Sequence, residues 1–259
     1  DRPTGLWFMN FCYEWGCTTS VQPNGAGGAA LRRSLDWPFN GIGRHVVVAH
    51  VARPGDVGDY YNVTWPGFGG VITAMAPGRF AIAINQAPLA RTSGLKPLDW
   101  LTARMKVNRS RALPPAHLLR RVFEECADFE AAVAMLRDTK IALPVIYSIS
   151  GTTADQCVMI ERKETTAETR RENLVAANHW CHSTPQGHAR GIDSWGRARQ
   201  MTSYLDDMPG ELDWMRPPIL NPDTRLAVWA DASQNRLVVR GYEADGPATH
   251  VFNLPATAS

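Results

Sequence analysis

The chain has 259 residues, of which 44% are hydrophobic and 20% are charged, and its formal net charge is +2 at pH 7. A hydrophobic fraction of this size predicts a globular core and excludes a disordered chain. The near balance of 27 basic and 25 acidic residues excludes a strong electrostatic attraction to nucleic acid or to anionic membranes. The sequence contains no run of about 18 apolar residues, so we expect no transmembrane helix.

The cysteines predict no disulfide framework. They are irregularly spaced in a large chain, and their odd number leaves at least one thiol unpaired within the chain: Cys12, Cys17, Cys126, Cys157 and Cys181. The sequence begins with Asp1 and not with Met, which is compatible with removal of an upstream signal peptide. The sequence therefore assigns no compartment, and we expect a soluble protein that is either cytoplasmic or exported.

Strands are predicted first in chain order. The β-branched segment 45–52 is typical of a buried strand, and segment 60–67 predicts a second one. Pro77-Gly78 is a turn signal between two apolar segments. We therefore expect a β-hairpin there, whose second arm runs into Asn85.

Helices follow, and then strands return. Apolar residues at helical spacing predict helices over 96–108 and 114–140, the second of them divided by a helix cap at Asp128. Further strands are expected in "PVIYSIS", "QCVMIERK" and "NLVAANHW", followed by a helix in "SWGRARQMTSYLDDM" and a hairpin over 224–244. Strand pairs separated from helical blocks predict an α+β class, in which antiparallel sheets pack against helical layers.

Cys17, in the stretch "EWGCTTS", is the first candidate for chemistry. A thiol with a pKa of about 8.5 is mostly protonated at neutral pH, so a nucleophilic cysteine needs a base or a nearby positive charge. Cleavage of the peptide bond before Cys17 would place an α-amine, with a pKa of about 7.7–8.0, on the same residue as the thiol. Gly16 suits this chemistry because a residue without a Cβ leaves room for attack on its own carbonyl.

The segment "RSLDWPF" supplies a cation and a carboxylate three residues apart. A guanidinium at Arg33 would favour the thiolate, and a carboxylate at Asp36 would orient a free amine. Side chains three residues apart in a strand point to opposite faces. Both groups therefore reach one site only if the strand twists or ends there.

The arrangement "C-T-T … R-x-L-D", formed by Cys17, Arg33 and Asp36, resembles the cysteine N-terminal-nucleophile (Ntn) hydrolases. The nearest resemblance is to the choloylglycine hydrolases, which include bile salt hydrolase and penicillin V acylase. The acid-ceramidase and isopenicillin N acyltransferase groups are similar. The matching motifs extend from Cys17 to Arg199, about two thirds of the chain.

Three downstream segments resemble the same group. "AIAINQAP" is similar to the strand end whose asparagine serves the oxyanion hole, which would be Asn85. "AANHW" is similar to the segment with a second active-site asparagine, which would be Asn178. "DSWGRAR" is similar to the segment that supplies a late arginine, which would be Arg197 or, with a shifted alignment, Arg199.

The resemblance implies a four-layer αββα sandwich of two antiparallel sheets. It also implies autocatalytic removal of residues 1–16 as a propeptide, which leaves a single domain over 17–259. The implied activity is hydrolysis of linear, non-peptide amide bonds through a thioester, without a cofactor or a metal ion. The implied partner is a small N-acyl amide, and the many tryptophans favour an apolar acyl group. A homo-oligomer is also compatible with the resemblance.

Other interpretations remain open at this stage. The same scaffold could support an acyltransferase or a non-catalytic ligand-binding protein, and Cys17 could be a buried structural thiol. His179 could act as the base of a papain-like thiol hydrolase, although the local "C-G-S-C-W" signature is absent. The stretch "NHWCHSTPQGH" also contains metal-ligating residue types, but without a second cluster of paired spacing: His179, Cys181, His182 and His188.

Overall fold

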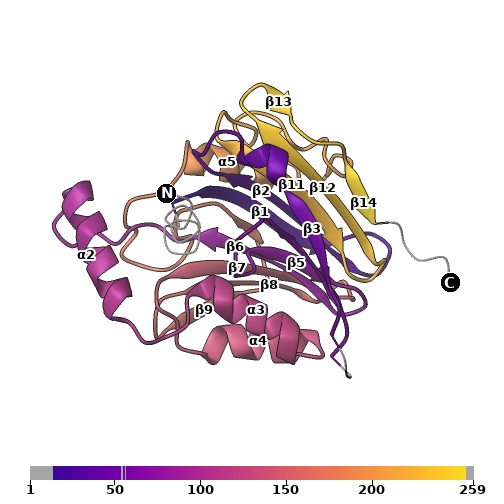
Figure 1. Ribbon diagram of the computed structural model, residues 1–259, viewed down its shortest axis with the longest axis horizontal. Coiled ribbons are helices and arrows are strands. Elements are labelled where there is room, and N and C mark those ends of the chain that lie inside the picture. The colour runs from indigo at the N-terminus through magenta and orange to yellow at the C-terminus, as the bar shows by residue number, and fades with distance from the viewer. Residues whose placement is uncertain (1–13, 54, 56, 255–259) are drawn as a thin grey trace.

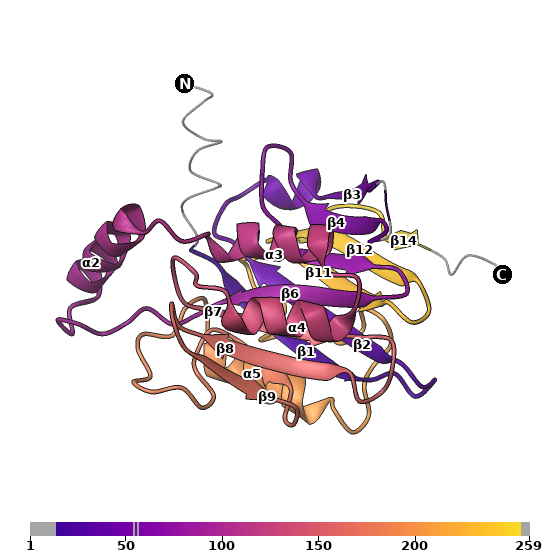
Figure 2. The ribbon, with the colours of Figure 1, turned by 90° about the horizontal axis from the view of Figure 1, so that it is seen from below.

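Two antiparallel sheets form the centre of the computed structural model, which describes residues 14–53, 55 and 57–254 (Figures 1 and 2). The first sheet has the order β10-β1-β2-β11-β12-β13, and β14 also pairs with β12. Its strands are β1 (Gly16–Pro23), β2 (Ala29–Asp36), β10 (Val175–Ala176), β11 (Thr224–Asp231), β12 (Arg236–Glu243), β13 (Gly246–Pro247) and β14 (Phe252–Leu254).

The second sheet follows chain order from β3 to β9. Its strands are β3 (Val47–Val51), β4 (Tyr60–Thr64), β5 (Thr73–Ala76), β6 (Phe80–Gln86), β7 (Val145–Ser150), β8 (Cys157–Arg162) and β9 (Ala167–Arg170). The central strands β1 and β2 of the first sheet lie against β6 and β7 of the second. One continuous apolar cluster fills the space between the sheets, so the strands at the centre are buried.

Helices cover the outer faces of both sheets. α3 (Pro115–Glu125) and α4 (Phe129–Asp138) lie on the second sheet, and Asp128 caps α4 by accepting a hydrogen bond from the Ala131 N–H at 2.8 Å, as predicted (Figure 2). α5 (Ser194–Ser203) packs on β1 and β10, and the 3₁₀ helix η1 (Ile42–His45) packs on β12. The order helix, sheet, sheet, helix confirms the predicted αββα sandwich.

The structure corrects the prediction for segment 45–52. A strand is present there, but β3 is the edge of the second sheet and the side chains of Val47 and His50 are exposed. Consecutive β-branched residues favour a strand without showing whether both of its faces are covered. Conversely, hydrophobic periodicity does not reveal β1 and β2, because their small, hydroxyl and charged side chains are buried through specific polar contacts.

The helix predicted over 96–108 is present as α2 (Lys96–Arg109), and it extends away from the sandwich in both views (Figures 1 and 2). Leu98, Trp100, Leu101 and Met105 on this helix are exposed. None of the helices in the described part of the chain has the length and hydropathy that crossing a bilayer requires.

Phe123 provides a test of how α3 is attached to the second sheet. Its ring is fully buried and lies 5.1 Å, between ring centroids, from both Tyr60 and Phe80. We expect Phe123→Ala to lower the free energy of unfolding by about 3–5 kcal/mol, because it removes the buried ring and leaves a cavity. Urea denaturation measures this change. Phe39→Ala, at a ring that is 56% exposed, is the matched control and should cost far less.

Candidate active site

The sulfur of Cys17 lies between the two sheets, near the start of β1. The side chain is fully buried, and Cys17 pairs with Leu35 of β2. Arg33 Nη2 donates to Cys17 Sγ at 3.4 Å and to the carbonyl oxygen of Ile84 in β6 at 3.1 Å. The guanidinium thus places a positive charge at the sulfur, as the sequence predicts.

The backbone of Cys17 is held by side chains and not by a second strand. β10 pairs with β1 only at Thr19 and Ser20, so no strand of the described residues lies beside the β1 edge at Cys17. The Cys17 N–H donates instead to Asn178 Oδ1 at 2.6 Å, and the Cys17 carbonyl accepts from Arg197 Nη1. The peptide unit before the nucleophile is therefore accessible to functional groups.

Asp36 lies directly opposite Gly16 in the β1–β2 pairing. Its Oδ1 accepts from Thr224 Oγ1 at 3.0 Å, and its Oδ2 pairs with Arg197 Nη1 at 3.4 Å. A Cβ added to Gly16 would lie only 3.0 Å from Asp36 Oδ2, so the carboxylate is directly against the residue that precedes Cys17.

Arg33 and Asp36 are three residues apart, and both can lie near Cys17 because β2 ends at Asp36. Asp36 is the last residue of the strand, where the register with β11 shifts between Thr224 and Leu226. Arg33 contacts the second sheet, whereas Asp36 contacts α5, as strand alternation requires. The two groups thus lie on different sides of the start of β1, Arg33 at the sulfur of Cys17 and Asp36 against Gly16.

Asn178 connects the two sheets around Cys17. Besides accepting from the Cys17 N–H, its Oδ1 accepts from Arg197 Nη2 at 3.0 Å, and its Nδ2 donates to the Gln86 carbonyl at 2.8 Å. The Asn178 backbone N–H donates to Ser194 Oγ at 2.8 Å. All of these atoms are buried, so the amide is fixed in orientation.

The structure places Arg197, and not Arg199, at Cys17. Arg197 projects from α5, is fully buried and also donates to Thr18 Oγ1 at 3.0 Å. Arg199 is exposed on the same helix. A spacing of two residues on a helix turns a side chain by more than half of a revolution, so only one of the two can reach the site.

Asn85 does not direct its amide at the sulfur. Its Nδ2 donates to the carbonyls of Ala176 and Ala177, both at 3.1 Å, and its Oδ1 accepts from Thr19 Oγ1 at 2.5 Å. The neighbouring Gln86 instead directs its backbone N–H to Cys17 Sγ. The sequence analysis missed this donor because a backbone N–H leaves no signal in residue type.

The charge state of the site follows from its burial. Burial raises the pKa of the Cys17 thiol above its ordinary value, and Arg33 and Arg197 act in the opposite direction, while Asp36 raises it further. Burial also raises the pKa of Asp36, against the influence of Arg197. The sulfur of the uncut chain is therefore a protonated thiol at neutral pH.

His179 is not positioned as a base for Cys17. Its Nδ1 lies 2.7 Å from Ser194 Oγ, and its ring stacks on Trp195 with a centroid distance of 3.5 Å. Burial, with a smaller contribution from Arg197, lowers the pKa of His179 to about 4. These contacts do not support the papain-like interpretation. Across residues 14–53, 55 and 57–254, no three His, Cys, Asp or Glu side chains gather as a metal site, so the "NHWCHSTPQGH" stretch gains no support as one.

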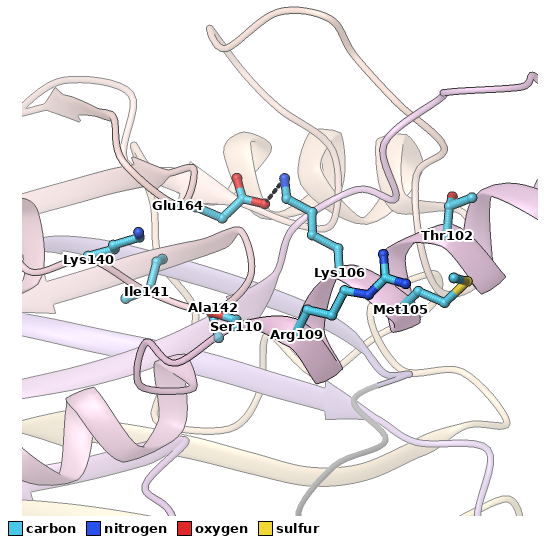
Figure 3. Close-up of a pocket in the computed structure, with 9 residues that line it drawn as sticks. All are labelled: Thr102, Met105, Lys106, Arg109, Ser110, Lys140, Ile141, Ala142 and Glu164. Carbon is cyan, nitrogen blue, oxygen red and sulfur yellow. Dashed lines mark ion pairs between the residues drawn. The ribbon is translucent and has the colours of Figure 1, made fainter.

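A pocket of about 230 Å³, which we call the acyl pocket, approaches Cys17 through its neighbours Gln86 and Glu14, while none of the six predicted site residues lines it. Its walls are largely apolar and come from the end of β6, from α2 and from the loop before β7. They include Gln86, Ala87, Leu89, Trp100, Val107 and Leu143, with Glu14 and Arg190 at one side. An adjoining cavity of about 450 Å³ lies between α2 and residues 140–142 and shares Lys106, Ala142 and Glu164 with the acyl pocket, and none of the six predicted site residues lines it either (Figure 3).

Residues 52–219 match the model of the acyl-coenzyme A:6-aminopenicillanic acid acyl-transferase family. The chain belongs to this family. The matched region includes Asn85, Asn178 and Arg197, and it begins after Cys17, Arg33 and Asp36. The geometry around Cys17 therefore adds information that the family match does not contain.

The curated proteins that this chain resembles include N-acylethanolamine-hydrolyzing acid amidases. That of Caenorhabditis elegans is 28% identical over 167 residues, 64% of this chain and 44% of the relative. That of Oryctolagus cuniculus is 28% identical over 157 residues, 60% of this chain and 41% of the relative. The matched region thus spans less than half the length of these relatives.

Solved structures show the fold. An ortholog of the same amidase from Caenorhabditis elegans superposes with a TM-score of 0.66 at 18% identity, covering 92% of this chain and 100% of that one. Penicillin V acylase from Agrobacterium tumefaciens gives a TM-score of 0.53 at 17% identity, covering 93% and 86%. The predicted Ntn hydrolase fold is confirmed by these neighbours.

Thr224 provides a test of the buried carboxylate. Thr224→Val removes a hydroxyl donor from Asp36 Oδ1 while keeping the side-chain volume, and we expect a loss of about 1.5–3 kcal/mol in the free energy of unfolding. The hydrogen bond stabilises the charged carboxylate and so lowers its pKa. The loss should therefore be full above the folded-state pKa of Asp36 and shrink as the pH falls through it. Urea denaturation at neutral and acid pH measures this, with the exposed Thr202→Val as control.

Proposed function

We propose that this protein hydrolyses linear amides with Cys17 as an N-terminal nucleophile. One observation carries the proposal. Arg33 lies at the sulfur of Cys17, while Asp36 and Asn178 lie beside Gly16 and the Cys17 nitrogen. Both the thiol and the α-amine that cleavage would create on this one residue therefore have partners in place.

Maturation would begin with attack of the Cys17 thiol on the Gly16 carbonyl. The C–N bond breaks, a C–S bond forms, and the thiol proton ends on the released α-amine. Water then hydrolyses the thioester, which frees residues 1–16 with a new carboxylate and restores the thiol. The mature domain would be residues 17–259. Of the released segment, the structure describes residues 14–16. The first nine residues of the aromatic stretch "GLWFMNFCYEW", Gly5 to Tyr13, lie outside the described residues.

Turnover would repeat the thioester chemistry on a substrate. The α-amine of Cys17 takes the thiol proton, and the sulfur attacks the substrate carbonyl. The backbone N–H of Gln86, which faces the sulfur, would donate to the developing oxyanion, and such a donor is typically worth about 3–4 kcal/mol. The proton passes to the leaving amine, and water resolves the thioester.

The remaining charged groups would position the nucleophile. Asp36, whose Oδ2 lies against Gly16, would orient the new amine. Arg197 would hold the Cys17 carbonyl and hence the residue as a whole. Arg33 would lower the thiol pKa once the site is open to substrate and water.

The apolar walls of the acyl pocket support an N-acyl amide with an apolar acyl segment as the substrate. The names of the relatives agree with acyl amides as a class, since they name N-acylethanolamines and penicillin V. Acyl transfer is the second candidate, because the family model is that of an acyltransferase. The two reactions share the thioester and differ in whether water or another amine resolves it.

Intact mass and N-terminal sequencing test the proposal directly. We expect the purified protein to yield a chain beginning at Cys17, and the increase of amidase activity to follow its appearance. Cys17→Ala should retain residues 1–16 and be inactive. His179→Ala should still be cut and active, because the His179 ring hydrogen bonds with Ser194 and not with the nucleophile. A fully active preparation with an intact bond between Gly16 and Cys17 would contradict the mechanism.

A further inference from the structure

Glu14, three residues before Cys17, places its carboxylate at the side of the acyl pocket. Arg190 Nη1 donates to Glu14 Oε2, and Trp100 Nε1 donates to Glu14 Oε1 at 2.9 Å. Two donors from opposite walls of the pocket, one from the loop before α5 and one from α2, thus bind the two oxygens of one carboxylate.

Arg190 is firmly connected to the catalytic network. Its backbone N–H donates to the Asn178 carbonyl at 3.2 Å, and its own carbonyl accepts from Arg197 Nη2 at 3.3 Å. Its Nε donates to the Ala87 carbonyl at 2.9 Å, and only 15% of the side chain is exposed. The guanidinium therefore has a fixed position relative to Cys17.

The other described carboxylates that line the acyl pocket are bound elsewhere. Asp99 accepts from Thr92 and Ser93 and lies 3.1 Å from His188 Nε2. Glu164 pairs with Lys106, as the dashed line in Figure 3 shows. Departure of the segment before Cys17 would therefore leave Arg190 facing the pocket without the carboxylate that it binds in the uncut chain.

Residues 14–16 correspond to the acyl half of the substrate, because each forms a thioester with the sulfur of Cys17 in the proposed mechanism. During maturation the acyl group on Cys17 Sγ is the chain that ends at Gly16, and during turnover it is the acyl group of the substrate. Both species are thioesters on the same sulfur beside a free α-amine. Residues 14–16 therefore mark the path of an acyl group away from the sulfur.

We propose that Arg190, with Trp100, binds a carboxylate carried by the acyl half of the substrate, and that Glu14 occupies this site in the uncut chain. This inference rests on the proposed function. The Glu14 carboxyl carbon is about ten covalent bonds from the Gly16 carbonyl carbon, so a dicarboxylic acyl group of about eleven carbons has the matching length. The substrate class is then the monoamide of a medium-chain dicarboxylic acid, whose methylene segment suits the apolar walls.

Three anilides of equal chain length test the assignment. They are the mono-anilide of undecanedioic acid, the methyl ester of that compound, and N-undecanoyl-4-aminobenzoate, which carries its carboxylate on the amine half. For the cut wild-type enzyme we expect kcat/KM to be about tenfold or more higher for the first compound than for its ester, mainly through KM, because a charged hydrogen-bonded pair forms.

Arg190→Gln should bring the ratio between the acid and its ester close to one. Lys106→Gln removes a positive charge from the same pocket at a residue that pairs with Glu164, and it should keep the wild-type ratio. Arg190→Lys, which keeps the charge without the forked donors, should give an intermediate ratio. Glu14→Gln should also keep the wild-type ratio, because the change lies in the released segment.

Equal rates for the acid and the ester in the wild type would overturn the inference, as would a preference that survives in Arg190→Gln. A preference for the aminobenzoate that Arg190→Gln removes would place the carboxylate on the amine half and overturn the acyl assignment. Intact mass separates these outcomes from failure of the proposed function. A chain that is never cut contradicts the mechanism, whereas a cut and active chain without the preference contradicts only the role of Arg190.

Discussion

The site depends on the way in which one residue of β1 is bound at its backbone. At Cys17 the strand has β2 on one side, and within the part of the chain that the structure describes no strand lies on the other, so the N–H and the carbonyl bind Asn178 and Arg197. A second strand at this position would occupy these backbone groups in a ladder. The absence of that strand lets the nucleophile and the nitrogen beside it share one site.

The charges around Cys17 are buried, and only Asp36 and Arg197 among the described residues at the site form an ion pair. Unpaired charges at this depth would be strongly destabilising, so the two arginines, the carboxylate and the amides must form as a set. Asp36 and Arg197 neutralise one another on the α5 side, while Arg33 faces the sulfur on the side of the second sheet. Burial raises the pKa of Asp36, so keeping this carboxylate charged inside the protein costs stability.

Sequence patterns predicted the α+β class and most elements, because the hairpin at Pro77-Gly78 and the amphipathic helices α3 and α4 have strong local signals. The motif resemblance named Cys17 and five further site residues, and the structure brings four of those five around Cys17. Asn85 differs, since its amide bonds to two carbonyls and the backbone of Gln86 faces the sulfur. Backbone donors, the edge position of β3 and the contact of Arg190 with Glu14 depend on tertiary geometry, which residue types do not encode.

The position of Asn85 has a consequence for how rigidly the two sheets are held together near Cys17. Its side chain joins β6 to Thr19 of β1 and to the two carbonyls at β10, so it is a polar cross-link through the interior of the sandwich. Hydrogen bonds of this kind fix a separation within tenths of an ångström, whereas apolar contacts adjust to the volumes of their neighbours. Asn85 therefore ties the end of β6, where Gln86 follows, to β1 two residues beyond Cys17. The strands that carry the nucleophile and the Gln86 N–H are thereby joined by a bond that is independent of the apolar packing around them.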